Sequence, residues 1–316
     1  MDFDVWNTAA VRYLLELWVF LLGGAVGSFL NVVVYRLPRG ESLLWPPSHC
    51  PRCNHPIRWY DNVPILSWMI LAGRCRDCRG PIAIRYPVVE AMCAAMFLVV
   101  LLRIGIGAHL PQRPVPVGEG VIFRTWTPLE TLGASAYYLV LLATLLAAGL
   151  IEYDGHPLPV GVALPALVIG ALAPLVWPQI RPVTAVAPWA GPTGRVEGPW
   201  ALWPGWIGLV DGLAGLGVGL AIGLAAWRLG GRKYLSLVVG PACLGLFLGW
   251  QACVPVSLAA VLLHGGLGWA KSRWPRGTTL GLERWSPGLV LWLGGLAWIV
   301  AWERLWGLFG LVRKIL

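Results

Sequence analysis

Charged residues are scarce in this 316-residue chain, because Asp, Glu, Lys and Arg together make up only 12% of it. An average soluble domain carries about twice that share, so the composition excludes an ordinary water-soluble protein. The net charge is +9, but the basic residues are scattered between apolar runs and form no continuous stripe. This pattern excludes nucleic acid as the expected partner. Low-complexity tracts and internal repeats of solenoid period are also lacking.

Apolar residues make up 57% of the chain, which contains 20 tryptophans and has a mean hydropathy of +0.69. The composition predicts an all-α polytopic membrane protein. A helix needs about 20 apolar residues to cross roughly 30 Å of hydrocarbon, and about eight runs approach this length. These predicted transmembrane helices are 14–35, 87–108, 132–151, 160–177, 205–227, 234–250, 252–269 and 287–302. The two runs that meet around Gly249 could instead form one long kinked helix.

A polar island at residues 50–78 interrupts the apolar runs and contains two CxxC pairs. Twenty-one residues separate Cys50 and Cys53 from Cys75 and Cys78. Two thiolates at i and i+3 can reach one ion, and two such pairs complete a tetrahedral sulfur shell that suits zinc. We therefore predict that the four sulfurs converge within about 4 Å of one another around a structural zinc ion. A redox pair or disulfides are the rival interpretations, and catalysis at a closed metal site is not expected.

The arginines predict the orientation of the chain in the membrane. Segment 36–86 contains eight of them, and basic residues concentrate on the cytoplasmic side of membrane proteins. We therefore predict an outside N-terminus and a cytoplasmic zinc-binding domain, the four-cysteine domain, where thiols also stay reduced. Anionic lipid headgroups are the expected partners of the remaining positive charge. Asp2 and Asp4 occupy the place of a signal peptide's basic region, so the first span is expected to be retained.

Several motifs follow one another in the first third of the chain. They are Gly27-Ser-Phe-Leu-Asn31, Ser48-His-Cys-Pro-Arg-Cys53, Tyr60-Asp-Asn62 and Arg85-Tyr-Pro87. In this order they resemble the cytoplasmic domain and flanking spans of the type IV prepilin leader peptidase family. Later in the chain, residues 245–251 and 287–288 are similar to stretches of that family's peptidase half. The resemblance thus predicts a first span at 1–35, the four-cysteine domain at 36–86 and a multi-span peptidase-like domain at 87–316.

The resemblance implies a multi-pass aspartic endopeptidase of the bacterial inner membrane. Members of the family cut a short basic leader from the hydrophobic helix of type IV pilin or type II secretion pseudopilin precursors. They also methylate the new N-terminus, which implies S-adenosylmethionine as a second cofactor beside zinc. The implied partners are therefore a pilin-like precursor and membrane lipids.

The family's first catalytic aspartate follows isoleucine and precedes a Leu-Pro-Asp motif. The corresponding stretch here begins Ile151-Glu152-Tyr-Asp154, so Glu152 stands where the first aspartate belongs. Val160 replaces the acid that ends the motif. The resemblance therefore implies Glu152 as the candidate catalytic acid, with Asp154 as its nearest neighbour in sequence.

The family's second aspartate lies in a Gly-Asp-x-Lys motif that is not intact in this chain. Aligning that motif on Lys233 puts Gly231 at the aspartate position, whereas aligning it on the later Gly-Leu-Phe-Leu-Gly-Trp stretch puts Leu237 there. The sequence contains no Asp or Glu between Asp211 and Glu283. Both catalytic aspartate positions are therefore substituted.

Aspartic proteolysis needs two carboxyls that share one water, one ionised and one protonated. Glu90 and Glu283 lie near predicted cytoplasmic ends of spans and are our leading partners for Glu152, with Asp154 next. Two hypotheses follow: an active peptidase with a rearranged acid pair, or a degenerate homologue that binds pilin-like helices or acts only in methyl transfer or assembly. A transporter is disfavoured, because charges within the spans are few and no two broken helices occupy matching positions.

Overall fold

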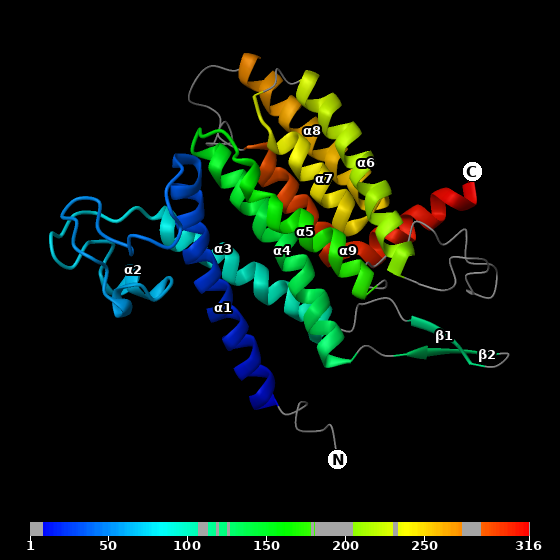
Figure 1. The fold of residues 1–316 in the computed structure, drawn as a ribbon, viewed down its shortest axis with the longest axis horizontal. Coiled ribbons are helices and arrows are strands. Elements are labelled where there is room, and N and C mark those ends of the chain that lie inside the picture. The colour runs from blue at the N-terminus through cyan, green and yellow to red at the C-terminus, as the bar shows by residue number, and fades with distance from the viewer. Residues whose placement is uncertain are drawn as a thin grey trace. The chain divides into compact units, whose positions relative to one another are not determined.

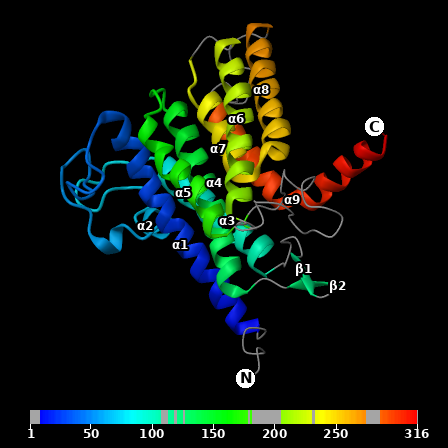
Figure 2. The same cartoon turned by 45° about the vertical axis from the view of Figure 1, so that its right-hand side comes forward.

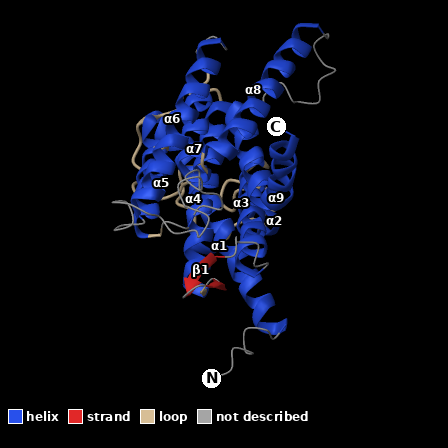
Figure 3. Ribbon diagram, turned by 90° about the vertical axis from the view of Figure 1, so that its right-hand side faces the viewer, coloured by secondary structure: helices blue, strands red, loops and turns tan. Residues whose placement is uncertain are grey.

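The computed structural model describes residues 9–106, 113–117, 120–124, 127–177, 180, 205–229, 233–273 and 286–315. The chain divides into two compact units, Met1–Leu102 and Arg103–Leu316, which we describe separately. This division follows contacts between residues, whereas the predicted domains follow position relative to the membrane. The predicted domain bounds therefore stay a prediction. Helices form nearly all of the regular structure (Figure 3).

The first unit is built on two long helices that pack against each other, α1 and α3 (Figure 1). They run antiparallel, because Gly27 of α1 meets Glu90 while the earlier Gly23 meets Ala94. A Cβ atom at either glycine would lie within 2.8 Å of the α3 backbone, so the small residues allow the close approach. The elements are α1 (Ala9–Arg36), η2 (Leu37–Arg39), η3 (Trp59–Asp61), α2 (Leu66–Ile70) and α3 (Arg85–Val100), and the boundary between the two units falls within the π-helical η4 (Leu101–Ile106).

The second unit surrounds a central helix, α7, in which every residue except Val239 is buried. This helix contacts α4, α5, α6, α8 and α9 (Figure 2). The helices are α4 (Pro128–Tyr153), η5 (Val160–Val162), α5 (Leu164–Val176), α6 (Gly205–Leu229), α7 (Ser236–Leu248), α8 (Trp250–Arg273) and α9 (Pro287–Ile315). Because α7 is enclosed by helices, groups at its ends are placed by the packing of the whole bundle.

Glycines bring α6 against α7. A Cβ atom at Gly215 would overlap the carbonyl oxygen of Gly245, and one at Gly219 would overlap that of Pro241. Such backbone contact is typical of membrane helices, which associate through small residues rather than through a hydrophobic driving force.

The expected fold class is confirmed, since each predicted span corresponds to an apolar helix. Four segments are long and apolar enough to cross a membrane: Ala10–Arg39, Arg85–Ile104, Leu129–Tyr153 and Leu209–Leu229. The other four predicted spans correspond to shorter apolar helices: Val160–Val176, Ser236–Leu248, Trp250–Gly266 and Pro287–Ala301. The alternative of one kinked helix around Gly249 is wrong, because this glycine has φ 84° and ends α7.

One feature departs from the all-α expectation. Strands β1 (Arg113–Val117) and β2 (Gly120–Arg124) pair antiparallel in a two-stranded sheet. The predicted spans 87–108 and 132–151 left this stretch, which is rich in proline and glycine, without an assigned helix or strand. Proline is compatible with strands that have a free edge, as both strands of a two-stranded sheet do.

Candidate metal centre and carboxylate site

The first CxxC pair lies in a tight turn closed by backbone hydrogen bonds. The Cys50 N–H donates to the carbonyl of His55 at 2.9 Å, and the Asn54 N–H donates to the carbonyl of Cys50 at 2.8 Å. Asn54 has φ 59°, a left-handed conformation that asparagine tolerates better than most residues. A bridge between His49 and Pro56 completes the turn. This backbone conformation places both thiols on the same side of the turn.

The second CxxC pair repeats this turn 25 residues later. The Cys75 N–H donates to the carbonyl of Gly80 at 2.8 Å, and the Arg79 N–H donates to the carbonyl of Cys75 at 3.0 Å. Arg79 has φ 58°, like its counterpart in the first turn. Both turns have the sequence Cys-x-x-Cys-x-x-Pro-Ile. This signal was present in the sequence, but the repeat is too short to be found by a search for solenoid periods.

The four cysteine sulfurs form one cluster, with all Sγ atoms within 4.8 Å of one another. Cys50 Sγ and Cys78 Sγ are 3.8 Å apart. A tetrahedral ion with Zn–S bonds of about 2.3 Å requires sulfur–sulfur separations of about 3.8 Å. The donor set and its geometry therefore fit a zinc ion held by four thiolates.

The turns also shift the acidities of the first two thiols. Hydrogen bonds from the backbone N–H groups of Cys53 and Arg52 lower the pKa of Cys50 to about 6. The backbone N–H of His55 lowers the pKa of Cys53, but local desolvation and hydrogen bonds to the neighbouring thiols outweigh it and raise that pKa to about 11. At neutral pH, Cys50 therefore offers a thiolate to a metal first, and Cys53 must release a proton on binding.

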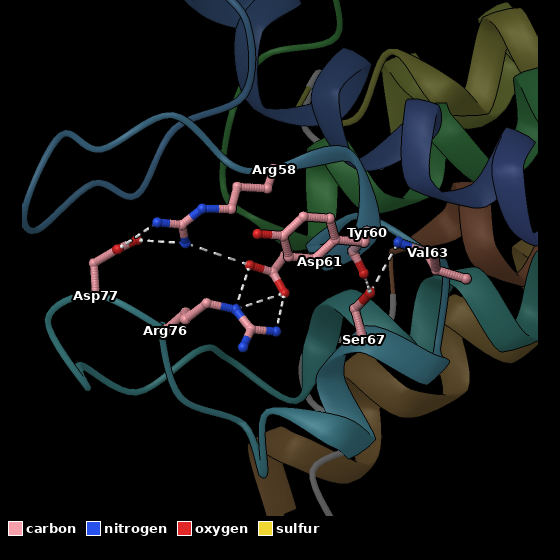
Figure 4. A network of polar contacts seen from close by, with 7 residues as sticks. All are labelled: Arg58, Tyr60, Asp61, Val63, Ser67, Arg76 and Asp77. Atoms are coloured by element: carbon pink, nitrogen blue, oxygen red, sulfur yellow. Dashed lines mark hydrogen bonds and ion pairs between the residues drawn. The ribbon is translucent and has the colours of Figure 1, made fainter.

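Ion pairs connect the second turn to the helical segment η3 (Figure 4). Arg76 donates from Nε and Nη2 to the Asp61 carboxylate at 2.8 and 2.6 Å, and Arg58 donates from Nη2 to Asp77 at 3.0 Å. The Asp61 side chain is only 8% exposed. Its hydrogen bonds with Arg76 lower the pKa of Asp61, so the carboxylate stays ionised. These pairs hold the Tyr60-Asp61-Asn62 motif against the second CxxC turn.

Glu90, one of the predicted partner acids, binds the loop that precedes α2. Its Oε2 accepts a hydrogen bond of 2.7 Å from the backbone N–H of Ile65. Glu90 thus belongs to the same compact unit as the cysteine cluster, whereas Glu152 belongs to the other unit. Their pairing stays a prediction.

Glu152 lies in the last turn of α4 and is buried, with 8% of its surface exposed. The Ser236 N–H donates to its Oε1 at 2.8 Å, and the Ser236 hydroxyl donates to its Oε2. Ser236 is the first residue of α7, so the carboxylate interacts with the positive end of that helix. Sequence reasoning missed Ser236, because a serine at the start of a helix carries no specific signal for a site.

The other predicted acids lie in different surroundings. Asp154 is exposed and caps the C-terminal end of α4, two residues after Glu152. Glu283 lies outside the residues that the structure describes. The structure therefore brings Glu152 to the α4–α7 junction and leaves its carboxyl partner a prediction.

The α4–α7 junction also contains a position implied by the second catalytic motif. Leu237, which takes the aspartate position in one of the two alignments, directly follows Ser236 in α7. The competing position, Gly231, is outside the described residues. The fold thus joins Glu152 to the residue that precedes Leu237, although the leucine is 5% exposed and carries no titratable group.

A family model and several curated proteins are similar to this chain. A model of the bacterial peptidase A24 N-terminal domain matches residues 21–104. A prepilin leader peptidase/N-methyltransferase of Klebsiella pneumoniae is 33% identical over 251 residues, which cover 77% of this chain and 89% of the relative. The chain belongs to the prepilin leader peptidase/N-methyltransferase family.

Other members of the family support the assignment over different lengths. A relative with the same name from Pseudomonas putida is 33% identical over 269 residues, with 71% of this chain and 81% of the relative covered. One from Myxococcus xanthus is 38% identical over 157 residues, but the match spans only 39% of that relative and 50% of this chain. No solved structure matches the chain.

The family assignment confirms the resemblance seen in the sequence motifs. It also agrees with the apolar helices, and together they indicate a bacterial inner-membrane protein. The relatives are named as prepilin peptidases, which supports an enzyme of the aspartic peptidase kind. The cysteine cluster lies within the matched N-terminal domain, so it is part of the region that carries the family match.

Proposed function

We propose that this protein processes pilin-like or pseudopilin precursors in the bacterial inner membrane as a leader peptidase. The supporting observation is the junction of α4 and α7, where Glu152 occupies the first catalytic position of the family beside Leu237, a candidate for the second. The substrate would present a basic leader followed by a hydrophobic helix. The cleavage site of the substrate would have to reach the junction of α4 and α7.

In this mechanism Glu152 acts as the base that takes a proton from the attacking water. A second carboxyl must supply a proton to the leaving amine, because one carboxyl cannot be ionised and protonated at the same time. Glu90, Glu283 and Asp154 are the proposed sources of that carboxyl. The Ser236 hydrogen bonds orient the Glu152 carboxylate toward the start of α7.

We assign Cys50, Cys53, Cys75 and Cys78 to a structural zinc ion. Zinc would cross-link the two turns and leave no open coordination position, so the chemistry takes place elsewhere. Methylation of the new N-terminus is a proposed second activity, for which S-adenosylmethionine would supply the methyl group. We assign no residue to that cofactor.

The decisive experiment is cleavage of a pilin-like precursor by the purified protein in detergent, with and without S-adenosylmethionine. Glu152→Gln is expected to reduce the cleavage rate by about 10²-fold or more, because the amide cannot accept the proton. Glu130→Gln is the matched control, since it lies at the other end of α4 in a capping box that also accepts glutamine. If the Glu152→Gln protein cleaves at the parent rate, Glu152 takes no part in the reaction.

A second candidate function is a homologue that binds pilin-like helices, or only methylates them, without proteolysis. It is favoured by the leucine at position 237 and by the occupation of both Glu152 oxygens by Ser236. In this case the parent protein would bind or methylate the precursor but not cut it. A gain of cleavage by the Leu237→Asp variant would then show that the missing acid is the cause.

We further propose that the four-cysteine domain faces the cytoplasm and that the N-terminus lies outside. The eight arginines of segment 36–86 support this orientation. A Ser42→Cys variant is expected to resist a membrane-impermeant thiol reagent in intact cells and to react after permeabilisation. A Glu119→Cys variant lies between the predicted spans 87–108 and 132–151, which this topology places outside, and should react in intact cells. The reverse result for the pair would overturn the topology.

A further inference from the structure

The short helix α2 exposes apolar side chains on one side. Leu66, Met69 and Ile70 are 49%, 64% and 76% exposed, respectively. Its other side is held by polar contacts, since the hydroxyl of the buried Ser67 donates to the carbonyl of Tyr60 at 3.1 Å. The exposed apolar face is therefore held in a defined orientation.

The turn that precedes α2 is hydrogen-bonded to α3. The Leu66 N–H donates to the carbonyl of Pro64 at 2.6 Å, and Ile65 between them has φ 64° and ψ −53°. These values describe a strained γ-turn, which a β-branched residue rarely adopts. The Ile65 N–H, which this turn directs outward, is bound by Glu90 at 2.7 Å. Glu90 thus fixes where α2 begins.

These contacts determine the position of α2 along the axes of α1 and α3. Glu90 is five residues, or about 7.5 Å of helix, past the start of α3 at Arg85. On α1, a Cβ atom at Gly24 would lie 3.2 Å from Pro64, and Gly24 is about 18 Å before the helix end at Arg36. Accordingly, α2 lies beside α1 and not beyond its C-terminal end (Figures 1 and 2).

At this level the surroundings of α2 would be lipid, because α1 and α3 are both candidate spans. An interfacial helix inserts its apolar face about 5–10 Å into the boundary between headgroups and acyl chains, which matches the distance of Glu90 from the start of α3. Exposed arginines on the two cysteine turns, Arg52, Arg74 and Arg79, add positive charge that suits anionic headgroups.

We propose that α2 is an interfacial anchor that inserts Leu66, Met69 and Ile70 into an anionic phospholipid bilayer. The anchor holds the four-cysteine domain against the membrane surface between the two spans that carry it. An apolar helix of a protein partner is the rival occupant of this face. Lipid is favoured because the segment that leads into α2 contacts α1 at Gly24 and α3 at Glu90, and both helices are candidate spans.

The test uses the full-length protein in vesicles of phosphatidylcholine and phosphatidylglycerol with bromine atoms on the acyl chains. An environment-sensitive fluorescent amino acid is introduced at Ile70 or, as a control, at Leu44. Leu44 is 89% exposed, but its segment is held at the C-terminal end of α1, where Arg36 donates to the carbonyls of Ser42 and Pro46. Quenching by bromine is expected to be several-fold stronger at position 70 than at position 44.

Zinc content of each variant shows whether the four-cysteine domain is folded. Equal quenching at the two positions would overturn the proposal. A photo-reactive amino acid at Met69 provides a second measurement, and a cross-link to phospholipid is expected. A cross-link to protein instead, whether to another part of this chain or to an added pilin-like peptide, would assign the face to a protein and also overturn it.

Discussion

A Cys75→Ser variant is expected to lose its zinc and, with it, the fold of the four-cysteine domain. Between residues 40 and 84, only Ser67, Gly73 and Gly80 are buried, so this segment has no apolar core of its own. Structural zinc sites supply about 10–16 kcal/mol of apparent binding free energy at neutral pH, which becomes folding free energy. Losing one of four thiolates should therefore reduce zinc retention by more than about 10-fold. Metal analysis and limited proteolysis of the purified protein measure both effects.

The matched control for this prediction is Cys253→Ser. Cys253 is buried in α8 and donates to the carbonyl of Pro241, an interaction that a serine hydroxyl can also make. This variant should retain its zinc and the protease resistance of the four-cysteine domain. If Cys75→Ser keeps both properties as well, the cluster does not hold a structural metal.

A Gly215→Ala variant is expected to destabilise the contact between α6 and α7 by about 3 kcal/mol, the upper range for added volume in a packed interior. The added methyl group would overlap the carbonyl oxygen of Gly245, and the backbone on both sides leaves no flexible side chain to move aside. The helices would have to separate along α7, the most enclosed helix of the unit. Thermal unfolding in detergent should show this as a lower transition temperature.

Gly217→Ala tests the same chemistry two residues further along α6. A Cβ atom at Gly217 would meet no other atom within 4 Å. Alanine is the better helix former by about 1 kcal/mol, so this variant should be neutral or slightly more stable. Equal destabilisation by the two substitutions would show that the overlap with Gly245 does not explain the effect of Gly215→Ala.

The apolar helices were predictable because hydropathy is a local property of the sequence. The predicted run at 132–151 corresponds to α4, and the run at 234–250 corresponds to α7. The break between α7 and α8 at Gly249 could not be located from hydropathy, because apolar residues flank this glycine on both sides. Its positive φ shows that two helices meet there. The strand pair at 113–117 and 120–124 was missed because its prolines and glycines are atypical of strands.

The cysteine cluster was predictable for a different reason. The spacing within each CxxC pair determines how two thiols are placed in a tight turn, and the need for four ligands connects the two pairs. The shared Cys-x-x-Cys-x-x-Pro-Ile pattern relates the two turns, but it did not specify that Asn54 and Arg79 are both left-handed at equivalent positions. That similarity depends on hydrogen bonds that residue identity alone does not specify.

The sequence by itself determined the membrane class, the apolar helices, the cysteine cluster and the family, because each depends on residue type and short-range spacing. Only the tertiary structure decided that Glu152 binds Ser236, 84 residues later, and that Glu90 binds the backbone of Ile65. A buried carboxylate must find donors to offset the loss of water. Which donors it finds depends on how closely the helices approach one another, and that depends on packing between segments far apart in the chain.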